Sequence, residues 1–399
     1  MRRLVLIVLL FLVLFSCSSK DEIKRKPDGE TCSLIQLDQD QYPDFYDDLS
    51  FEHLDKSLIK SIEYYKRGSK NRNLWFGEIG FTAEHLKKTL VDFLFFIQQK
   101  PTKEEFSKHI KENYLVFKSC GKKPFENVLF TGYYEPFLEG SIEKTKRFKY
   151  PVYPIPENIV YLDISKFYPE LPKKRITGRV DKNKFVPYFT REELNKKNIL
   201  SKHAKPIVWV DNKVDLFFLE IQGSGIIKLR DGSNLNIHYH SSNGHEYRSI
   251  GKYLVDLGKI PLEEISMQSI RAYLEKNPKE MDKIFNYNPS FVFFKTEKGG
   301  PYGSISVELT AKRSIATDSR VFPKGALCFI ETQEPIINEN EEIIDWVDFS
   351  RFVLNQDTGG AIKGPGRVDI FMGNGVEAEV TAGHLQHRGD LYFLVLKPD

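Results

Sequence analysis

The sequence predicts a mainly β protein with additional helices, divided into more than one domain. Short runs rich in β-branched and aromatic residues, bounded by Gly, Pro and Asn, fill most of the chain after residue 128. Helical periodicity is confined to two stretches, 49–117 and 247–285. A length of 399 residues fits two domains better than one. Many short strands at close spacing indicate a small barrel or a sandwich.

The first residues have the pattern of an export signal. Arg2 and Arg3 precede an unbroken apolar run over 4–15, which is too short to span a bilayer comfortably. Cys17 follows a small residue at the end of that run, as in the lipobox of bacterial lipoproteins, which predicts cleavage after residue 16 and lipidation of Cys17. Ser18 in place of Asp favours the outer membrane, with the protein facing the periplasm. An uncleaved signal anchor is the alternative.

Residues 17–42, the net charge and the aromatic content indicate which kinds of partner to expect. Residues 17–42 are polar and lack periodicity, so we interpret them as a tether between lipid and folded body. Lys and Arg number 58 against 55 Asp and Glu, and removal of the leader would leave the mature chain close to neutral. A near-neutral protein is a poor nucleic-acid binder. An aromatic content of 13% favours β structure or a surface that stacks on sugar rings.

Three further cysteines leave two interpretations. An oxidising compartment would allow one disulfide, and Cys32 with Cys120 is the favoured pair because Cys328 lies in an apolar run. Three buried thiols are the alternative. The chain contains no CxxC pair or zinc-type cysteine spacing.

The helical stretches carry recognisable boundary signals. Apolar residues recur at three- and four-residue steps between 86 and 97, and Pro101 should end this helix. Thr102 with Glu105 forms a capping box for the next helix. The Pro- and Lys-rich residues 150–197 are interpreted as part of an insertion. The predicted strands are 128–134, 184–189, 207–210, 216–222, 226–229, 291–294, 305–309, 327–331, 352–354, 368–372 and 391–396.

Two carboxylates stand out in the Gly-rich segment 356–371. Asp369 lies between Val368 and Ile370 in an apolar strand, and Asp357 precedes two glycines. A carboxylate in apolar surroundings is either paired structurally or has a raised pKa suited to general acid catalysis. Asp beside glycines is also common in turns. Asp318, in 314–323, is a third candidate.

Other constellations carry weaker signals. His238 and His240, with His245 nearby, and His384 with His387 could suggest zinc, but neither group has HExxH spacing. In a His-Tyr-His strand, a period of two places both imidazoles on one face without any metal. We therefore predict no metal site. No GxSxG nucleophile elbow is present.

The aspartates in their contexts carry a family resemblance. The segments ATDSRVFPKG, QDTGGAIKG and RVDIFMG resemble the 3D domain, which is named for three such aspartates. Upstream, FTGYYEP at 130–136, DLFFLEIQGSG at 215–225, NGHEYRSIG at 243–251 and NPSFVFF at 288–294 are similar to the membrane-bound lytic murein transglycosylase A family. These blocks occur in the same order from about residue 130 to the C-terminus.

This resemblance implies a fold and an activity. The fold would be a double-psi β-barrel domain over 43–135 and 245–399, with a smaller β domain inserted at 136–244 and a glycan groove between them. The activity would be that of an exo-acting lytic transglycosylase, which cleaves the β-1,4 bond between N-acetylmuramic acid and N-acetylglucosamine and leaves a 1,6-anhydro ring. The partners would be peptidoglycan strands, the membrane through the lipid anchor, and cell-wall synthesis or division proteins. No cofactor is implied.

The resemblance also assigns site residues. Asp369 is predicted to be catalytic, with Asp357 and Asp318 as supporting members of the catalytic site. The predicted substrate-binding residues are Thr131, Gly132, Tyr133, Tyr134, Glu135, Gln222, Gly223, Ser224 and Lys363. The alternative for the tyrosines is ordinary barrel packing, and for 222–225 it is a bulged strand end.

One carboxylate can suffice for such a reaction. If the C6 hydroxyl of muramic acid attacks the anomeric carbon, the nucleophile is already tethered, and proximity replaces a second carboxylate and a water. An inverting polysaccharide hydrolase, which needs that second carboxylate, is one alternative. A noncatalytic peptidoglycan-binding lipoprotein, in which Asp369 is structural, is the other.

Overall fold

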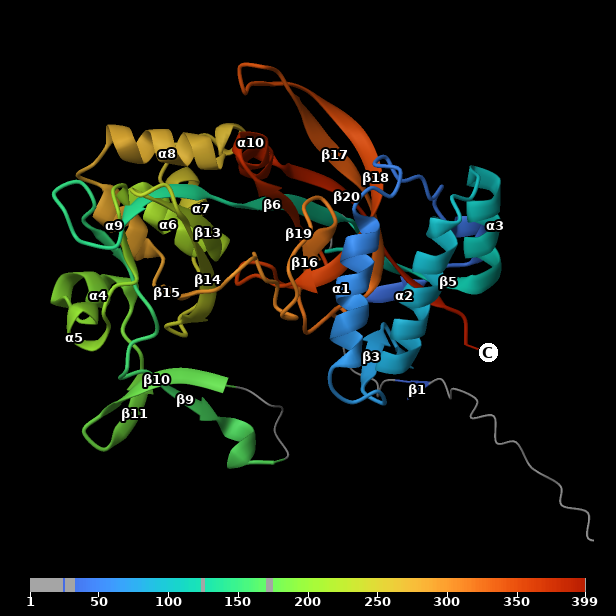
Figure 1. Ribbon diagram of the computed structural model, residues 1–399, viewed down its shortest axis with the longest axis horizontal. Coiled ribbons are helices and arrows are strands. Elements are labelled where there is room, and N and C mark those ends of the chain that lie inside the picture. The colour runs from blue at the N-terminus through green and yellow to red at the C-terminus, as the bar shows by residue number, and fades with distance from the viewer. Residues whose placement is uncertain (1–23, 26–32, 123–125, 170–174, 399) are drawn as a thin grey trace, which may run out of the picture.

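The computed structural model describes residues 24–25, 33–122, 126–169 and 175–398. Two lobes lie side by side along the long axis, one around an eight-stranded sheet and the other around a six-stranded sheet (Figure 1). The predicted leader, Cys17 and Cys32 lie outside the described residues. Among the residues that are described, no helix is long and apolar enough to cross a membrane.

The larger lobe is a barrel-like sheet in the order β17-β18-β16-β19-β6-β20-β5-β2. An extra antiparallel pairing between β17 and β20 closes the part of the sheet from β17 to β20 into a ring. The β6–β19 and β16–β18 pairs are parallel, which brings segments distant in sequence into register. The strands are β2 (Leu34–Gln36), β5 (Tyr114–Ser119), β6 (Val128–Glu135), β16 (Ser314–Ala316), β17 (Leu327–Ile337), β18 (Ile343–Asp357), β19 (Arg367–Asn374) and β20 (Gln386–Leu396).

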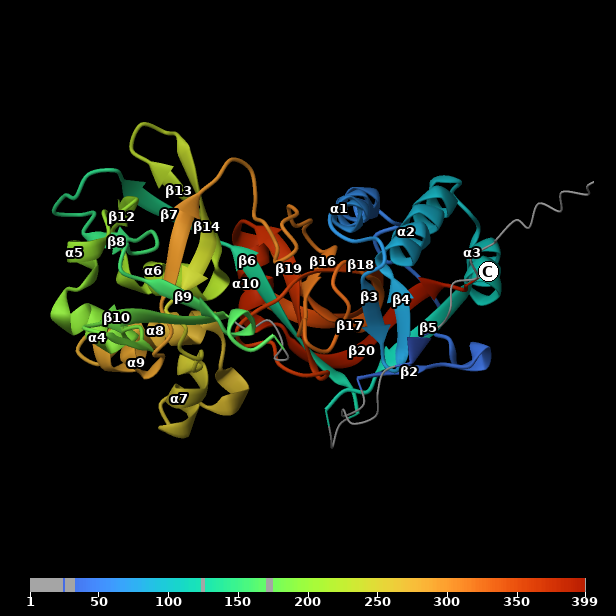
Figure 2. The same cartoon turned by 90° about the horizontal axis from the view of Figure 1, so that it is seen from below.

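Helices α1 (Leu54–Lys66), α2 (Ala83–Gln98), α3 (Lys103–Asn113) and α10 (Val376–His384) pack on this sheet. Figure 2 shows α2 and α3 at the end of the molecule away from the smaller lobe. A short ribbon of β1 (Lys24–Arg25), β3 (Asn73–Phe76) and β4 (Ile79–Thr82) accompanies them. The predicted capping box is confirmed, since the Thr102 and Glu105 amides each donate to the other's side chain at 2.8 and 3.2 Å.

The smaller lobe has the strand order β15-β14-β13-β7-β12-β8. Its strands are β7 (Phe137–Ser141), β8 (Tyr150–Val152), β12 (Val208–Val210), β13 (Ser224–Leu229), β14 (Asn234–Ser242) and β15 (Val292–Thr296). Its helices are α4 (Arg191–Lys197), α5 (Leu200–His203), α6 (Lys213–Gln222), α7 (Ile250–Asp256), α8 (Met267–Lys276) and α9 (Met281–Tyr287). Because β15 pairs with β14, this sheet extends past residue 244, and the predicted domain boundary there does not coincide with its end.

A separate three-stranded unit projects from the smaller lobe (Figure 1). It consists of β9 (Val160–Asp163), β10 (Arg175–Asp181) and β11 (Lys184–Pro187), so the stretch interpreted as an insertion contains strands. Short 3-10 helices occur at Gln39–Gln41, Ile164–Lys166 and Leu262–Glu264.

Two predicted strands are wrong. Residues 216–222 belong to helix α6, which the Asn212 side chain caps and Gly223 ends at φ 83°. This helix is buried between the sheet and α7 to α9, so its apolar residues do not show one-sided periodicity. Residues 305–309 form a loop with a single bridge between Tyr302 and Glu308, because the Leu309 amide bonds within the loop to Pro301 O at 2.8 Å.

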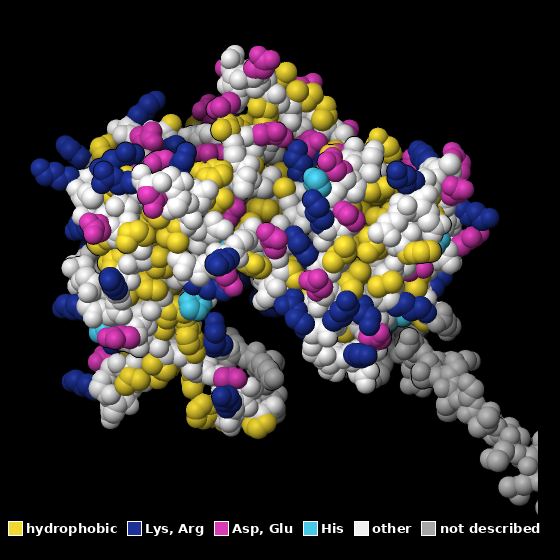
Figure 3. Space-filling view, in the orientation of Figure 1, with side chains coloured by type: hydrophobic (Ala, Val, Ile, Leu, Met, Phe, Trp, Pro, Cys, Tyr) yellow, Lys and Arg dark blue, Asp and Glu magenta, His cyan; other side chains and the backbone are white. Residues whose placement is uncertain are grey.

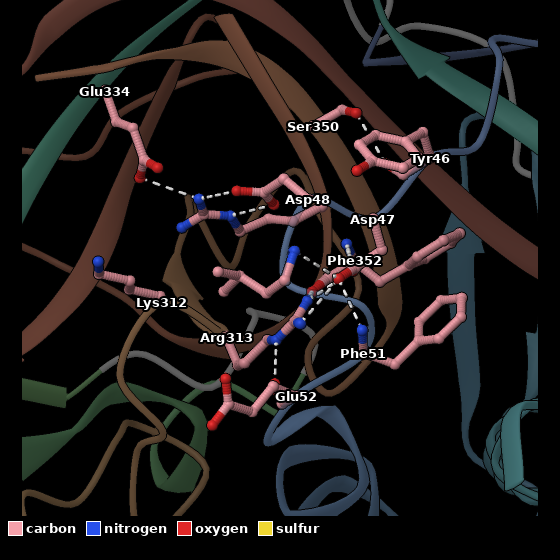
Figure 4. Close-up of polar contacts among 12 residues, drawn as sticks. Tyr46, Asp47, Asp48, Phe51, Glu52, Lys312, Arg313, Glu334, Ser350 and Phe352 are labelled. Atoms are coloured by element: carbon pink, nitrogen blue, oxygen red, sulfur yellow. Dashed lines mark hydrogen bonds and ion pairs between the residues drawn. The ribbon is translucent and has the colours of Figure 1, made fainter. Parts of the chain in front are cut away.

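Buried ion pairs fasten the N-terminal segment to the barrel (Figure 4). The fully buried Arg313 forms two hydrogen bonds with Asp47, at 2.6 and 2.9 Å. Arg351, also fully buried, contacts Asp48 at 2.5 Å and Glu334 at 2.9 Å. Since Arg313 directly precedes β16, this anchor fixes the start of a strand in the centre of the barrel. We call Asp47, Asp48, Arg313 and Arg351 the anchor cluster.

Two of the four cysteines, Cys120 and Cys328, lie within the described residues. Cys120 is disulfide-bonded, whereas Cys328 is a free, buried thiol. The predicted partner Cys32 lies outside the described residues, so the pairing itself stays a prediction.

Candidate active site

The barrel brings the three predicted aspartates to one end of neighbouring strands. Asp357 ends β18 and Asp369 lies in β19, while β16 runs between them with Ala316 paired to both. Asp318 follows two residues after β16. Three segments that are separate in the sequence therefore meet because of the β18-β16-β19 order.

Asp369 lies on the face of β19 opposite the core. Val368 and Ile370 are fully buried, and the two-residue period of the strand turns Asp369 away from them. Thr131 is directly opposite on β6 and donates its hydroxyl to Asp369 Oδ1. Burial raises the pKa of Asp369, the charge of Arg367 opposes this rise, and the charge of Asp357 adds to it, so that the pKa is about 6. Such a carboxyl can hold a proton close to neutral pH.

Asp357 is the second carboxylate at this end of the barrel. Its Oδ1 accepts hydrogen bonds from the Ser304 and Thr358 amides, both at 2.8 Å, and its Oδ2 accepts one from the Tyr133 hydroxyl at 2.9 Å. Burial raises the pKa of Asp357 despite these donors. The Tyr133 ring packs on Phe371, with 5.3 Å between ring centroids.

Asp318 has different surroundings. It is 3% exposed, and it accepts hydrogen bonds from the Arg320 guanidinium at 2.6 and 2.9 Å and from the Gly364 amide at 2.7 Å. Burial alone would raise the pKa of Asp318, but these donors outweigh it and lower the pKa to about 2. Asp318 thus holds the loop between β18 and β19, on which Lys363 is exposed.

Several predicted substrate-binding residues have packing roles. A Cβ on Gly132 would lie 2.7 Å from Ala382 Cα, so the glycine allows α10 to approach β6. Tyr134 is buried, and its amide donates to Gln222 Oε1 at 3.0 Å, which ties α6 to β6. Gly223 ends α6, and Ser224 begins β13. The packing alternative therefore describes Tyr134, and sugar contacts for this group stay predictions.

Glu135 lies where the chain leaves the barrel for the smaller lobe. It is 3% exposed and pairs opposite Asn374 on β19. Burial raises the pKa of Glu135, a hydrogen bond with Asn374 opposes this rise, and the charge of Glu308 adds to it, so that the pKa is about 7. Glu135 is the second carboxyl on β6 and β19 with a pKa near neutrality.

One residue that the sequence interpretation did not single out also faces this site. Tyr247 comes from the smaller lobe, after β14, and its Cβ lies 3.8 Å from the position of a Cβ on Gly360. Burial raises the pKa of Tyr247, and Arg367 and Asp369 are among the charges that act on it. The NGHEYRSIG block was the available signal for Tyr247. The surface between the β9–β11 unit and the larger lobe is hollowed (Figure 3).

Three of the five histidines considered as ligands bond to backbone carbonyls. His238 lies 3.0 Å from Gly299 O, His245 lies 2.7 Å from Tyr188 O, and His384 lies 2.9 Å from Val380 O. Within the described ranges, no group of three or more His, Cys, Asp and Glu side chains could hold a metal ion.

Comparison with known proteins gives consistent matches. Residues 129–295 match the MltA specific insert domain, and residues 313–395 match the 3D domain. The chain is 34% identical over 281 residues to membrane-bound lytic murein transglycosylase A of Escherichia coli, covering 70% of this chain and 68% of that protein.

Solved structures agree with these matches. A membrane-bound lytic murein transglycosylase from Agrobacterium tumefaciens superposes with a TM-score of 0.73 and 27% identity, covering 91% of this chain and 98% of that one. E. coli MltA with bound chitohexaose superposes with a TM-score of 0.66 and 25% identity, covering 95% and 97%.

Proposed function

Because the chain belongs to the membrane-bound lytic murein transglycosylase A family, we propose that it cleaves the β-1,4 bond between N-acetylmuramic acid and N-acetylglucosamine in peptidoglycan. The proposed product is a 1,6-anhydromuramic acid end. The observation that carries this proposal is Asp369, a carboxyl with a pKa of about 6 that faces away from the core and bonds to a neutral hydroxyl. A carboxyl in that state can first donate and then accept a proton.

The proposed reaction uses Asp369 twice. Protonated Asp369 gives its proton to the glycosidic oxygen as the bond to the anomeric carbon breaks. The C6 hydroxyl of the same muramic acid then attacks that carbon, and the Asp369 carboxylate accepts the hydroxyl proton. No water enters the product, and the proton returns to Asp369, so the step balances without a further reactant. The tethered hydroxyl supplies proximity that a free water would lack.

The neighbouring residues support Asp369 in this proposal. Burial is the main cause of the raised pKa of Asp369, the Asp357 carboxylate adds to it, and Tyr133 donates a hydrogen bond that orients Asp357. Asp318 positions the loop that carries Lys363. Lys363 and the backbone near Thr131 would contact the sugars.

We extend the proposal to architecture and location. The ring of strands that β17 and β20 close would be a double-psi barrel, and the six-stranded sheet would belong to an inserted domain. Lipidation of Cys17 would hold the protein at the outer membrane, facing the periplasm.

The hydrolase alternative requires a second carboxylate that activates water. Asp357 already accepts three hydrogen bonds, from Ser304, Thr358 and Tyr133. Little capacity remains for it to take a proton from water, so these contacts favour the transglycosylase.

Product analysis tests the proposal. Purified sacculi are digested with the full-length protein and with Asp369→Asn, and the released muropeptides are analysed by mass spectrometry. Products lighter by one water than hydrolytic products, absent with the variant, are expected. Products with reducing ends would indicate the hydrolase, and binding without release by folded protein would indicate the binding lipoprotein.

A further inference from the structure

We propose that Arg367 binds the carboxyl group of the lactyl substituent on muramic acid and that Tyr247 forms the opposite wall of this subsite. The inference rests on the proposed function and names the group by which the site would recognise its sugar. N-acetylglucosamine lacks this substituent, so Arg367 would determine which sugar lies at the cleaved bond.

The position of Arg367 follows from the strand. Arg367 begins β19 two residues before Asp369, so both side chains emerge on the same face. Two residues of strand span roughly 6.6 Å, about the length of one sugar ring. A group bound at Arg367 therefore lies beside the sugar whose glycosidic oxygen faces Asp369.

The guanidinium of Arg367 has a hydrogen-bond donor without a partner among the described residues of the protein. Arg313, Arg320 and Arg351 each form an ion pair with a carboxylate. Within the part of the chain that the structure describes, Arg367 forms no ion pair, and its buried Nε has no hydrogen-bond partner. A buried donor without a partner is costly, so this arrangement indicates a group that the substrate supplies.

The lactyl group offers the hydrogen-bond acceptor that the Arg367 Nε lacks in the described part of the protein. A carboxylate accepts two parallel hydrogen bonds from a guanidinium, and an amide carbonyl, as in a peptide-bearing strand, accepts one. Tyr247 reaches the site from the smaller lobe and lies against the Gly360 loop. The substituent would therefore lie between the two lobes, where Arg367 supplies the charge and Tyr247 an aromatic wall.

Substrate binding would also affect the protonation of Asp369. The positive charge of Arg367 favours loss of the proton from Asp369. On a peptide-free strand, a lactyl carboxylate on Arg367 would offset that charge and favour the protonated form of Asp369, whereas an amide-linked stem peptide would leave the charge of Arg367 in place. On peptide-free strands, recognition of the sugar and protonation of Asp369 would then be coupled through Arg367.

A pair of matched substrates tests the subsite. Peptide-free glycan strands expose a carboxylate on every muramic acid, and coupling with methylamine converts these groups to neutral amides. We expect the wild-type protein to cleave the carboxylate strands with kcat/KM roughly tenfold higher, mainly through KM. Arg367→Met should reduce this ratio to about one, and Arg367→Lys should retain part of it.

Arg388→Met is the matched control. Arg388 pairs opposite Leu129, as Arg367 does, but from β20 on the other side of β6. A general loss of positive charge would lower the ratio in both variants, which would overturn the proposal. So would an unchanged ratio in Arg367→Met, or equal losses on both substrates.

The two proposals fail in different ways. If the wild-type protein releases no anhydro product, the proposed function fails. Titration calorimetry with the same two strands still tests Arg367, because carboxylate selectivity in binding needs no turnover. Selectivity that persists in Arg367→Met would overturn the subsite even in an active enzyme.

Discussion

The anchor cluster and the candidate active site bury carboxylates in the same lobe with different partners. In the anchor cluster, Asp47 and Asp48 each face a fully buried arginine. In the site, Asp369 meets a threonine hydroxyl, and Asp357 meets a tyrosine hydroxyl and two amides. Burial accordingly raises the pKa of both site carboxylates, to about 6 for Asp369.

Asp318 shows that the pKa of an aspartate in this set depends on its hydrogen-bond donors and not on the sequence motif to which it belongs. It belongs to the same set of three aspartates, yet Arg320 and the Gly364 amide lower its pKa to about 2. Asp318 therefore resembles the anchor cluster in pairing with an arginine and holding backbone, whereas Asp369 is the residue that we propose to transfer the proton.

The largest effect is expected for Asp369→Asn. Loss of the only carboxyl proposed to transfer the proton should lower kcat about a thousandfold. The pKa of Asp369 is raised from 3.8 to about 6 on folding, so the folded state loses stability as pH rises through this range. Asparagine does not ionise and so avoids this loss of stability. The melting temperature of the variant at pH 8 should therefore be equal to or higher than that of the wild-type protein. A marked loss of stability would show that Asp369 is structural.

Asp47→Asn should lower the stability and leave kcat almost unchanged, which is the reverse of the effect expected for Asp369→Asn. The substitution at Asp47 leaves Arg313 buried without its charge partner, which typically costs about 3–5 kcal/mol of unfolding free energy. Urea denaturation measures this loss, while kcat of the folded fraction should change little. The double variant Asp47→Leu with Arg313→Met is the control, and it should be more stable than the single variant because no charge remains unpaired.

Asp357→Asn should change the pH profile. The proposed acid must be protonated, so kcat/KM should fall about tenfold per pH unit above about pH 6. Removing the Asp357 charge removes a cause of the raised pKa, so this decline should begin at lower pH. We expect a loss of up to about tenfold at pH 7, because Asp357 is a smaller cause of the raised pKa than burial and a shift of one pKa unit corresponds to a factor of about ten. An unchanged profile would contradict electrostatic coupling between the two aspartates.

Thr131→Val should have the smallest effect. The hydroxyl donates to Asp369 and so stabilises the carboxylate form. Its loss should move the decline in kcat/KM to slightly higher pH, with less than about a tenfold change in rate. Thr131→Ser, which keeps the hydroxyl, should behave like the wild-type protein. A shift to lower pH in Thr131→Val would reverse the assigned direction of the hydrogen bond.

Local signals in the sequence predicted much of the fold. The Thr102–Glu105 capping box and the strand at 128–134 correspond to α3 and β6. Helix α6 was missed because it is buried between a sheet and other helices and is therefore apolar on most sides. Short β16 was missed because three residues carry too little pattern, although it joins Asp357 and Asp369.

The sequence by itself determined that Asp369 would emerge from a strand between two core residues, since alternation and apolar neighbours are local properties. Only the tertiary structure decided the partners. The Gly364 amide on Asp318, Tyr133 on Asp357 and Tyr247 beside the Gly360 loop depend on distant parts of the chain that meet in the barrel and between the lobes. A carboxylate's pKa follows from those distances and from burial, and neither can be read from neighbouring residues.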